Sequence, residues 1–253
     1  MPIAAQTGDM LPMRRVASVL LFASIWLISS QVPAQGPTPL DRGEVKVEHL
    51  AFSTDDGALI YADVYGAGDQ GVVLAHGGRF TKESWKPQAE QLARLGFHVL
   101  AFDFRGFGAS HGPGDSDMFK APVHLDVLGA VRFLRRNGAK TVAVIGASFG
   151  GGAAADAAIA SRPGEIDRLI LLAAKGSGAA ERLKAPLLEI VARDDANDDG
   201  PRLPHIRAWF DRAPQPKELI ILDGSAHAQF LFQTSHDRRL MAEIVRFLRS
   251  RAK

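Results

Sequence analysis

The stretch from Thr141 to Gly150 constrains the fold of this chain more than any other. Its first five residues, 141–145 (TVAVI), have the apolar, β-branched character of a buried strand. Gly146-Ala147-Ser148-Phe149-Gly150 follows, and the Ala-rich run at 151–160 predicts a helix. A strand that passes into a helix through G-x-S-x-G must turn tightly, and its two glycines remove side chains that would clash. The pattern predicts that Ser148 is a strained nucleophile, with its hydroxyl exposed above a sheet.

A developing negative charge is expected to be stabilised beside Ser148. The backbone N–H of Phe149 and the start of the predicted helix point toward the same place as the hydroxyl. A second donor is expected from the loop 76–80 (HGGRF), which follows a short apolar strand at 71–75. Gly78 is the predicted donor of this oxyanion hole, with Arg79 as the alternative. His76 is expected to have a structural hydrogen-bonding role.

Strand-like and helix-like segments alternate along the chain. Segments 45–54 and 58–65 alternate in polarity around Asp55-Asp56-Gly57, which predicts a hairpin. Further strands are predicted at 71–75, 98–102, 141–145, 169–173, 187–191 and 218–222, and helices at 83–95, 123–136, 151–160, 203–212 and 238–249, with a short helical segment within 178–184. This order predicts an α/β fold with a mostly parallel sheet of about eight strands and helices on both faces.

An activated serine needs a base that takes its proton. Three histidines follow Ser148 at a sufficient distance along the chain, namely His205, His227 and His236. His227 lies in the segment DGSAH, directly after the predicted strand 218–222, which places it at the carboxyl edge of the sheet together with Ser148. Because ligands bind at this edge in open α/β sheets, His227 is the predicted base.

The acid that orients the base is expected at the same edge. The predicted strand 187–191 runs into Ala192-Arg193-Asp194-Asp195. Asp195 is the preferred acid, and Asp194 is its main competitor. Asp198 and Asp199 are expected to belong to a solvated acidic loop.

The same acidic stretch allows an alternative interpretation as a calcium loop. Asp195, Asn197, Asp199 and Gly200 match the first half of the pattern D-x-N-x-D-G. The twelfth position is Ile206, where a bidentate Glu is needed, and no predicted helix precedes the loop. A metal site is therefore disfavoured, and hydrolysis by a serine requires neither a metal nor an organic cofactor.

The first 34 residues have the order of a secretory signal peptide. A basic pair at 14–15 precedes the apolar run 16–32, and Val32-Pro33-Ala34 ends in a small residue, so cleavage is expected after Ala34. An uncleaved membrane anchor is the alternative, and Met13 is a possible start. Residues 35–44 are predicted to be a linker, and 45–253 a single domain of an exported, periplasmic or secreted protein.

The composition is that of an ordinary globular protein. Of the 253 residues, 46% are hydrophobic and 23% are charged, which is enough apolar material for a sizeable core. The chain has no cysteine, so no disulfide framework is possible. A net charge of +2 without a Lys/Arg-rich block gives no support for nucleic acid binding. Contact with a membrane is expected only if the segment 1–34 is retained.

These motifs resemble those of the α/β-hydrolase superfamily, from about Val45 to the C-terminus. The resemblance is carried by the loop 76–78 (HGG), by 103–110 (DFRGFGAS), which is similar to the family's D-x-R-G-x-G-x-S, by G-x-S-x-G, and by the pairing of 186–195 with 224–227. In the family an acid often lies nine residues after a proline such as Pro186, which favours Asp195. Ala192 departs from the pattern, because a glycine is common there. The resemblance implies structural roles for Asp103 and Arg105.

The resemblance is greatest to small carboxylesterases and dienelactone-hydrolase-like enzymes. The latter typically use a cysteine nucleophile, and this chain has none. Only about a dozen residues separate the predicted strand 169–173 from Pro186, which leaves no room for the helical cap of many members. An open pocket is therefore expected. Arg79, Phe80 and Trp85 are predicted to bind substrate, and Phe107 and Phe149 are further candidates to line the pocket.

The predicted function is that of an exported serine hydrolase acting on carboxylic esters of small to mid-sized substrates through an acyl-enzyme. A peptidase or amidase with the same three residues is one alternative. A non-catalytic binding protein on a hydrolase scaffold is the other, and the presence of a complete Ser-His-Asp set argues against it.

Overall fold

The computed structural model describes residues 45–250, which belong to one compact unit. The predicted signal peptide (1–34) and linker (35–44) lie outside the described residues. Within 45–250 no helix is both long enough and apolar enough to cross a membrane.

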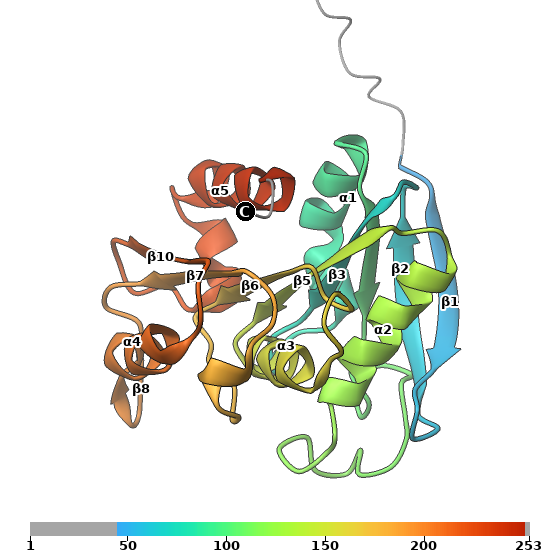
Figure 1. Cartoon of the computed structure of the whole chain (residues 1–253), viewed down its shortest axis with the longest axis horizontal. Coiled ribbons are helices and arrows are strands. Elements are labelled where there is room, and N and C mark those ends of the chain that lie inside the picture. Colours follow the sequence, from blue (N-terminus) through green and yellow to red (C-terminus); the bar gives the residue numbers. More distant parts are fainter. Residues whose placement is uncertain (1–44, 251–253) are drawn as a thin grey trace, which may run out of the picture. The chain divides into compact units, whose positions relative to one another are not determined.

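An eight-stranded sheet forms the centre of the described unit (Figure 1). Its strands run in the order β1-β2-β4-β3-β5-β6-β7-β10. β2 is antiparallel to both of its neighbours, and every other neighbouring pair is parallel. The prediction of a mostly parallel sheet of about eight strands is thus confirmed. The strands are β1 (Val47–Ser53), β2 (Leu59–Tyr65), β3 (Gln70–Ala75), β4 (His98–Phe102), β5 (Thr141–Ala147), β6 (Arg168–Leu172), β7 (Leu187–Ala192) and β10 (Lys217–Leu222).

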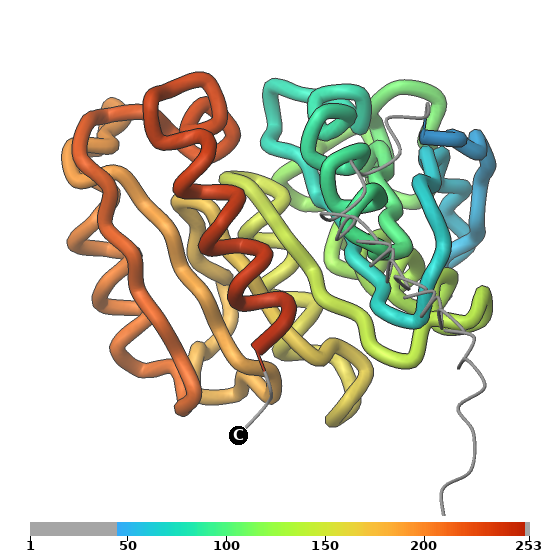
Figure 2. Tube along the Cα trace, turned by 90° about the horizontal axis from the view of Figure 1, so that it is seen from above, coloured from blue at the N-terminus to red at the C-terminus, as the bar shows by residue number. Residues whose placement is uncertain are grey.

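Helices cover both faces of this sheet. On one face lie α1 (Lys86–Arg94) and α5 (Asp237–Arg249), and Figure 2 shows them running over the same side of the strands. On the other face lie α2 (His124–Arg136), α3 (Phe149–Ala160) and α4 (Arg202–Arg212) (Figure 1). The buried side chains form two clusters: one includes residues of β1, α2 and α3, and the other residues of α1 and α5. Strands β3, β4 and β7 are buried along almost their whole length and are mainly apolar on both faces, so both faces need to be covered by helices.

The boundaries of two predicted helices differ from those in the structure. The predicted helix 83–95 is a 3-10 turn, η1 (Lys82–Trp85), followed by α1, which has Pro87 in its first turn. α3 begins at Phe149 rather than 151, because Ser148 alone connects strand and helix. Between β6 and β7 the chain forms only the 3-10 turn η2 (Ala180–Arg182), which leaves no cap domain there.

Two short elements were not predicted. Ala196–Asn197 (β8) and Gly200–Pro201 (β9) pair as a small antiparallel hairpin between β7 and α4. A 3-10 helix, η3 (Ala228–Gln233), directly follows His227. Both elements follow strands of the sheet at its carboxyl edge, where the candidate site lies.

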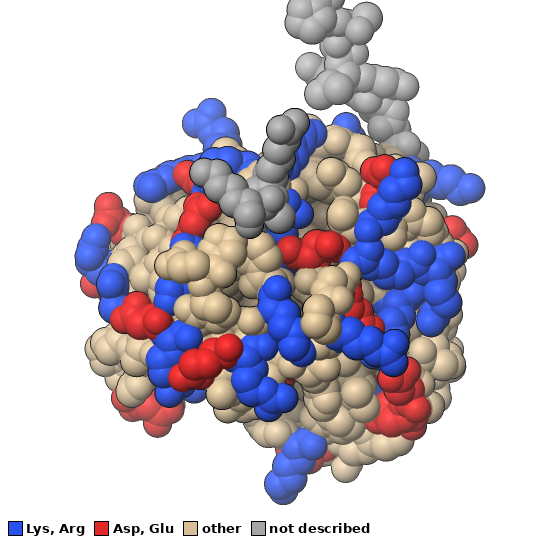
Figure 3. All heavy atoms as spheres, in the orientation of Figure 1, with Lys and Arg blue, Asp and Glu red and all other residues tan. Residues whose placement is uncertain are grey.

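Acidic and basic side chains are interspersed over the face of the molecule shown in Figure 3. This mixture agrees with a net charge of only +2.

Candidate active site

Ser148 occupies a strained turn between β5 and α3. Its φ is 51° and its ψ is −116°, a conformation that costs a non-glycine residue about 1–3 kcal/mol. The turn is tight on both sides: a Cβ on Gly146 would lie 2.5 Å from the Gly150 carbonyl oxygen, and a Cβ on Gly150 would lie 2.4 Å from the His76 carbonyl oxygen. The Ser148 N–H donates to the Leu172 carbonyl at 3.0 Å, which joins the turn to β6. Both glycines of the motif are therefore required by the geometry.

The structure brings Ser148, His227 and Asp195 into one hydrogen-bonded chain. His227 Nε2 lies 2.7 Å from Ser148 Oγ, and His227 Nδ1 lies 2.7 Å from Asp195 Oδ2. A carboxylate only accepts, so Nδ1 carries the hydrogen and Nε2 is free to accept from the hydroxyl. Asp195 is completely buried, whereas Asp194 is exposed and its N–H donates to the Gly224 carbonyl at 2.9 Å. Of the two acids that the sequence left open, Asp195 is the one that contacts the imidazole.

The other two histidines lie outside this chain. His205 is exposed on the first turn of α4, and His236 is at hydrogen-bond distance, 3.1 Å, from the Asp223 carbonyl. Asp195 is held from the opposite side by Arg202: the Arg202 N–H donates to the Asp195 carbonyl at 2.9 Å, and Arg202 Nε lies 3.4 Å from Asp195 Oδ1. The first residue of α4 thus positions the carboxylate.

The loop after β3 lies beside the start of α3. A Cβ placed on Gly78 would lie 3.4 Å from the Phe149 Cβ, so the two predicted oxyanion donors are neighbours. Within residues 45–250 neither the Gly78 nor the Phe149 N–H is paired with a protein acceptor. Both N–H groups are thus available to an oxygen bound at Ser148.

Gln229 holds this loop, and no motif in the sequence predicted this role. Its side chain is 6% exposed; Oε1 accepts from the Gly77 N–H at 2.7 Å, and Nε2 donates to Ser84 Oγ at 2.9 Å. The Ser84 hydroxyl in turn donates to the Thr81 carbonyl at 2.6 Å. A glutamine two residues after a histidine has no pattern that reveals such a contact, because its partners lie about 150 residues earlier in the chain.

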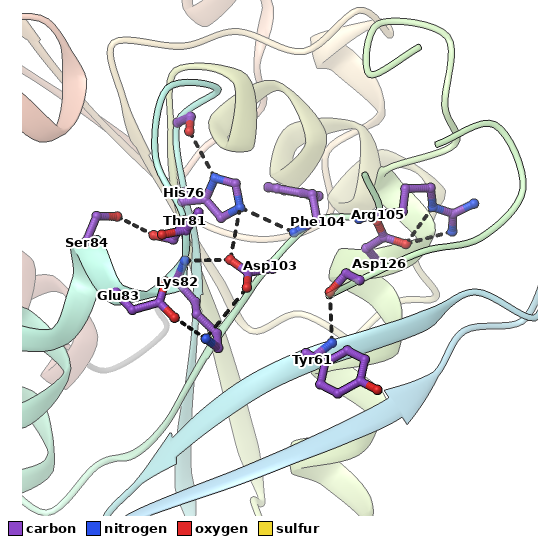
Figure 4. Close-up of polar contacts among 12 residues, drawn as sticks. Tyr61, His76, Thr81, Lys82, Glu83, Ser84, Asp103, Phe104, Arg105 and Asp126 are labelled. Carbon is purple, nitrogen blue, oxygen red and sulfur yellow. Dashed lines mark hydrogen bonds and ion pairs between the residues drawn. The ribbon is translucent and has the colours of Figure 1, made fainter. Parts of the chain in front are cut away.

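A buried polar network lies behind the oxyanion loop (Figure 4). His76 Nδ1 donates to the Gly77 carbonyl at 2.9 Å, and Nε2 accepts from the Phe104 N–H at 3.3 Å. Asp103 Oδ1 accepts from the Lys82 N–H at 2.7 Å and lies 3.9 Å from His76 Nε2. Burial lowers the pKa of His76, despite the opposing effect of Asp103. His76 is thus a neutral bridging residue, in agreement with its expected structural role.

Arg105, from the same motif as Asp103, is fully buried in a second network (Figure 4). Its Nε and Nη2 donate to Asp126 Oδ1 at 2.9 and 2.6 Å, and its backbone N–H donates to Asp126 Oδ2 at 3.0 Å. Its Nη2 also donates to Asp56 at 2.9 Å, and Nη1 to the Pro113 carbonyl at 2.9 Å. The bond from Arg105 lowers the pKa of Asp56 to about 2, whereas burial raises the pKa of Asp126. This guanidinium joins the β1–β2 hairpin, α2 and the loop after β4.

A cavity of about 380 Å³ opens beside Ser148. Its wall is formed by the turn after β5, the segment after β6, the β8–β9 hairpin and the first turn of α4. The residues that line the cavity are Ser148, Phe149, Ala173, Ala174, Lys175, Asn197, Asp199, Pro201, Arg202, His205 and Ile206. The polar side chains of this wall were not predicted, because they follow strands that lie apart in the sequence.

The three residues predicted to bind substrate do not line this cavity. Trp85 is 1% exposed, and its ring packs against Phe232 in the core at 5.7 Å, so its prediction as a substrate contact is not supported. Phe80 packs on Phe230 at 5.2 Å, and Arg79 is exposed. An aromatic residue after a strand end can point toward the core or toward the site, and the sequence does not distinguish the two. Of the two further candidates, Phe149 does line the cavity and Phe107 does not.

Comparison with known proteins supports the fold and its class. The chain belongs to the alpha/beta hydrolase fold family, whose model matches residues 71–247. It is 43% identical over 68 residues to a putative non-heme chloroperoxidase of Synechocystis, covering 26% of this chain and 24% of that protein. It is 32% identical over 121 residues to bifunctional epoxide hydrolase 2 of Sus scrofa (48% and 21%), and 29% identical over 157 residues to a non-heme chloroperoxidase of Streptomyces lividans (58% and 48%). The chain thus matches between about a fifth and a half of the length of these relatives.

Solved structures share the fold at low sequence identity. An esterase of Pyrococcus furiosus has a TM-score of 0.67 at 20% identity, covering 81% of this chain and 92% of that one. The dienelactone hydrolase of Anabaena variabilis has a TM-score of 0.62 at 19% identity, covering 80% and 96%. The resemblance to the α/β-hydrolase superfamily is confirmed, and with it membership in a family of hydrolases.

Proposed function

We propose that this protein is a serine hydrolase that cleaves carboxylic esters of small to mid-sized substrates. The observation that carries the proposal is the chain Ser148–His227–Asp195, with both contacts at 2.7 Å. The relatives described above include a chloroperoxidase and an epoxide hydrolase, so they do not decide between reactions. A serine hydroxyl paired with an imidazole and a buried carboxylate is the arrangement that acyl transfer requires.

In the proposed reaction each of these residues has its own role. His227 Nε2 takes the proton from Ser148 Oγ as the oxygen attacks the ester carbonyl, and the N–H groups of Gly78 and Phe149 receive the oxyanion. The protonated imidazole, stabilised by Asp195, gives its proton to the departing alcohol, which leaves an acyl group on Ser148. Water then gives a proton to His227 and attacks the acyl carbon. His227 returns this proton to Ser148 Oγ as the bond from that oxygen to the acyl carbon breaks, and the acid product leaves.

Burst kinetics with short p-nitrophenyl esters test this proposal. The parent chain should turn over, and Ser148→Ala should lose at least about a thousandfold in kcat/KM, as for removal of a triad nucleophile. Labelling by a fluorophosphonate should disappear in the same variant. Equal activity of the two proteins would refute the assignment of Ser148. An inactive parent that still takes the label would favour a peptidase or amidase.

We also propose that the protein is exported. The support is the basic, apolar and small-residue order of residues 1–34. N-terminal sequencing after expression of the full chain in a bacterium tests it: a mature chain beginning at Gln35 is expected. An intact N-terminus in the membrane fraction would instead indicate an anchor.

A further inference from the structure

The loop between β4 and α2 carries an unusually exposed aromatic side chain. Phe119 is 85% exposed, and within 45–250 the only other exposed large hydrophobic residue is Tyr61, at 37%. Hydrogen bonds fix the loop: the Phe119 N–H donates to Asp117 Oδ1 at 3.1 Å, and Arg105 donates to the Pro113 carbonyl at 2.9 Å. Single exposed apolar residues are ordinary on protein surfaces. A functional role for Phe119 therefore has to be argued from the residues around it.

Phe119 and the preceding residue, Met118, lie against the two predicted oxyanion donors: Phe119 against Phe149, and Met118 against Gly78. The Phe119 ring meets the Phe149 ring edge-on, with centroids 6.5 Å apart and an interplanar angle of 86°. Met118 Cε lies 2.9 Å from the position that a Cβ on Gly78 would occupy, so the thioether covers that glycine. Phe149 itself lines the cavity with Ser148. We call Met118, Phe119 and Phe149 the apolar wall.

The rest of the cavity wall is mixed, with apolar contributions from Ala173, Ala174, Pro201 and Ile206 and a set of polar side chains. Lys175, Arg202 and His205 line the cavity beside Ser148, together with Asn197 and Asp199. An ester whose carbonyl oxygen lies between the N–H groups of Gly78 and Phe149 therefore has the apolar wall next to its carbonyl. A substituent that covers this wall removes apolar surface from water, which is worth about a fourfold gain in binding for each methylene buried.

We propose that the apolar wall binds an alkyl or aryl group of the ester substrate, next to the carbonyl that Ser148 attacks. This inference rests on the proposed hydrolase function and names its substrate class. Esters of acetic acid with small alcohols leave Phe119 bare, whereas a longer chain or an aromatic ring covers it. The wall then selects substrates by apolar bulk close to the scissile bond.

Hydrolysis of two ester series by the full chain tests the proposal. One series runs from ethyl acetate to ethyl hexanoate and the other from methyl acetate to benzyl acetate, followed by titration of the released acid. In the parent, kcat/KM should rise at least about tenfold along one series. Phe119→Ala should remove most of that rise, with a loss of kcat/KM that grows from the smallest ester to the largest, and Phe119→Leu should restore part of it.

Tyr61→Ala is the matched control for loss of an exposed aromatic ring elsewhere, and it should leave both series unchanged. A rise that persists in Phe119→Ala would overturn the proposal. So would a variant that slows small and large esters equally, since that result would show a general effect on the catalytic geometry.

NMR signals of the methionine methyl groups report ligand binding independently of catalysis. The chain has five methionines, and Met118→Leu assigns the relevant signal. In the Ser148→Ala protein, addition of ethyl hexanoate or benzyl acetate should shift the Met118 methyl signal until the shift saturates. Adding Phe119→Ala to this variant should raise the ester concentration at which the shift saturates. If esters are hydrolysed but the Met118 signal does not move, the proposal that the apolar wall binds substrate is wrong and the hydrolase proposal stands. If no ester is hydrolysed but the signal moves, the hydrolase proposal fails and the binding site stands.

Discussion

The buried contact between Arg105 and Asp126 gives a stability prediction that follows directly from the geometry. Asp126→Asn keeps the shape of the side chain and one acceptor oxygen for the guanidinium. Its amide, however, places a donor against the Arg105 N–H, where Asp126 Oδ2 accepts at 3.0 Å. The guanidinium, fully buried, also loses one of its two carboxylate partners.

Breaking a buried ion pair by removing one partner costs about 3–5 kcal/mol. Asp56 remains in contact with Arg105, so we expect the lower end, about 3 kcal/mol. For a folded unit of this size, such a loss corresponds to a fall in Tm on the order of 6–12 °C. Urea unfolding followed by circular dichroism measures the free energy of unfolding.

Asp69→Asn is the matched control, since Asp69 pairs with Lys140 on the surface at 3.2 Å with both side chains mostly exposed. It should change the free energy of unfolding by less than about 0.5 kcal/mol. Replacing both partners, in Arg105→Met with Asp126→Leu, should cost less than the sum of the single replacements. A loss below about 1 kcal/mol in Asp126→Asn, or strict additivity in the double variant, would refute this account of the network.

Three further predictions concern the site. Gln229→Ala should leave the fold intact and lower kcat of ester hydrolysis about tenfold or more, with a smaller change in KM, because the Gly77 N–H loses its acceptor. Gln233→Ala is the control, and equal kcat values for Gln229→Ala and the parent would contradict the role of Gln229 in holding the oxyanion loop. Gly150→Ala should destabilise the protein by about 3 kcal/mol, because the Cβ would lie 2.4 Å from the His76 carbonyl oxygen. A Cβ on Gly152 would lie 3.4 Å from its nearest neighbour, so Gly152→Ala should not lower the free energy of unfolding in this way. Burial holds the pKa of His76 in the folded protein below its ordinary 6.5. The free energy of unfolding should therefore be constant above pH 6.5 as far as His76 is concerned, and should fall below pH 6.5 by up to about 1.4 kcal/mol per pH unit. In His76→Gln the free energy of unfolding should depend less on pH between about pH 6.5 and 5.

The sequence predicted the sheet and most helices because their signals are local. The apolar strands and the amphipathic helix at 124–136 carry their period in consecutive residues. Ser148 and His227 were placed for a related reason: each directly follows a strand, and parallel strands end at one edge of the sheet. Asp194 and Asp195 were harder to separate, because two adjacent residues in a loop differ only in which way each side chain points.

The contacts that were missed depend on tertiary packing. Gln229 meets Gly77 and Ser84 only after the last third of the chain has folded against the first. Trp85 was predicted to contact substrate, yet it belongs to the core, because η1 turns its ring toward Phe232. The hairpin of β8 and β9 is four residues of paired strand, too short to produce a periodic signal.

His227 and Gln229 belong to one short segment between β10 and α5, and this segment reaches both halves of the site. One residue contacts Ser148, and the other fixes the loop that carries Gly78. Local opening of this segment would therefore remove the general base and the restraint on the oxyanion loop in a single event. Loss of activity on warming should then follow the opening of 223–236, seen as faster amide hydrogen exchange, and should precede unfolding of the central sheet.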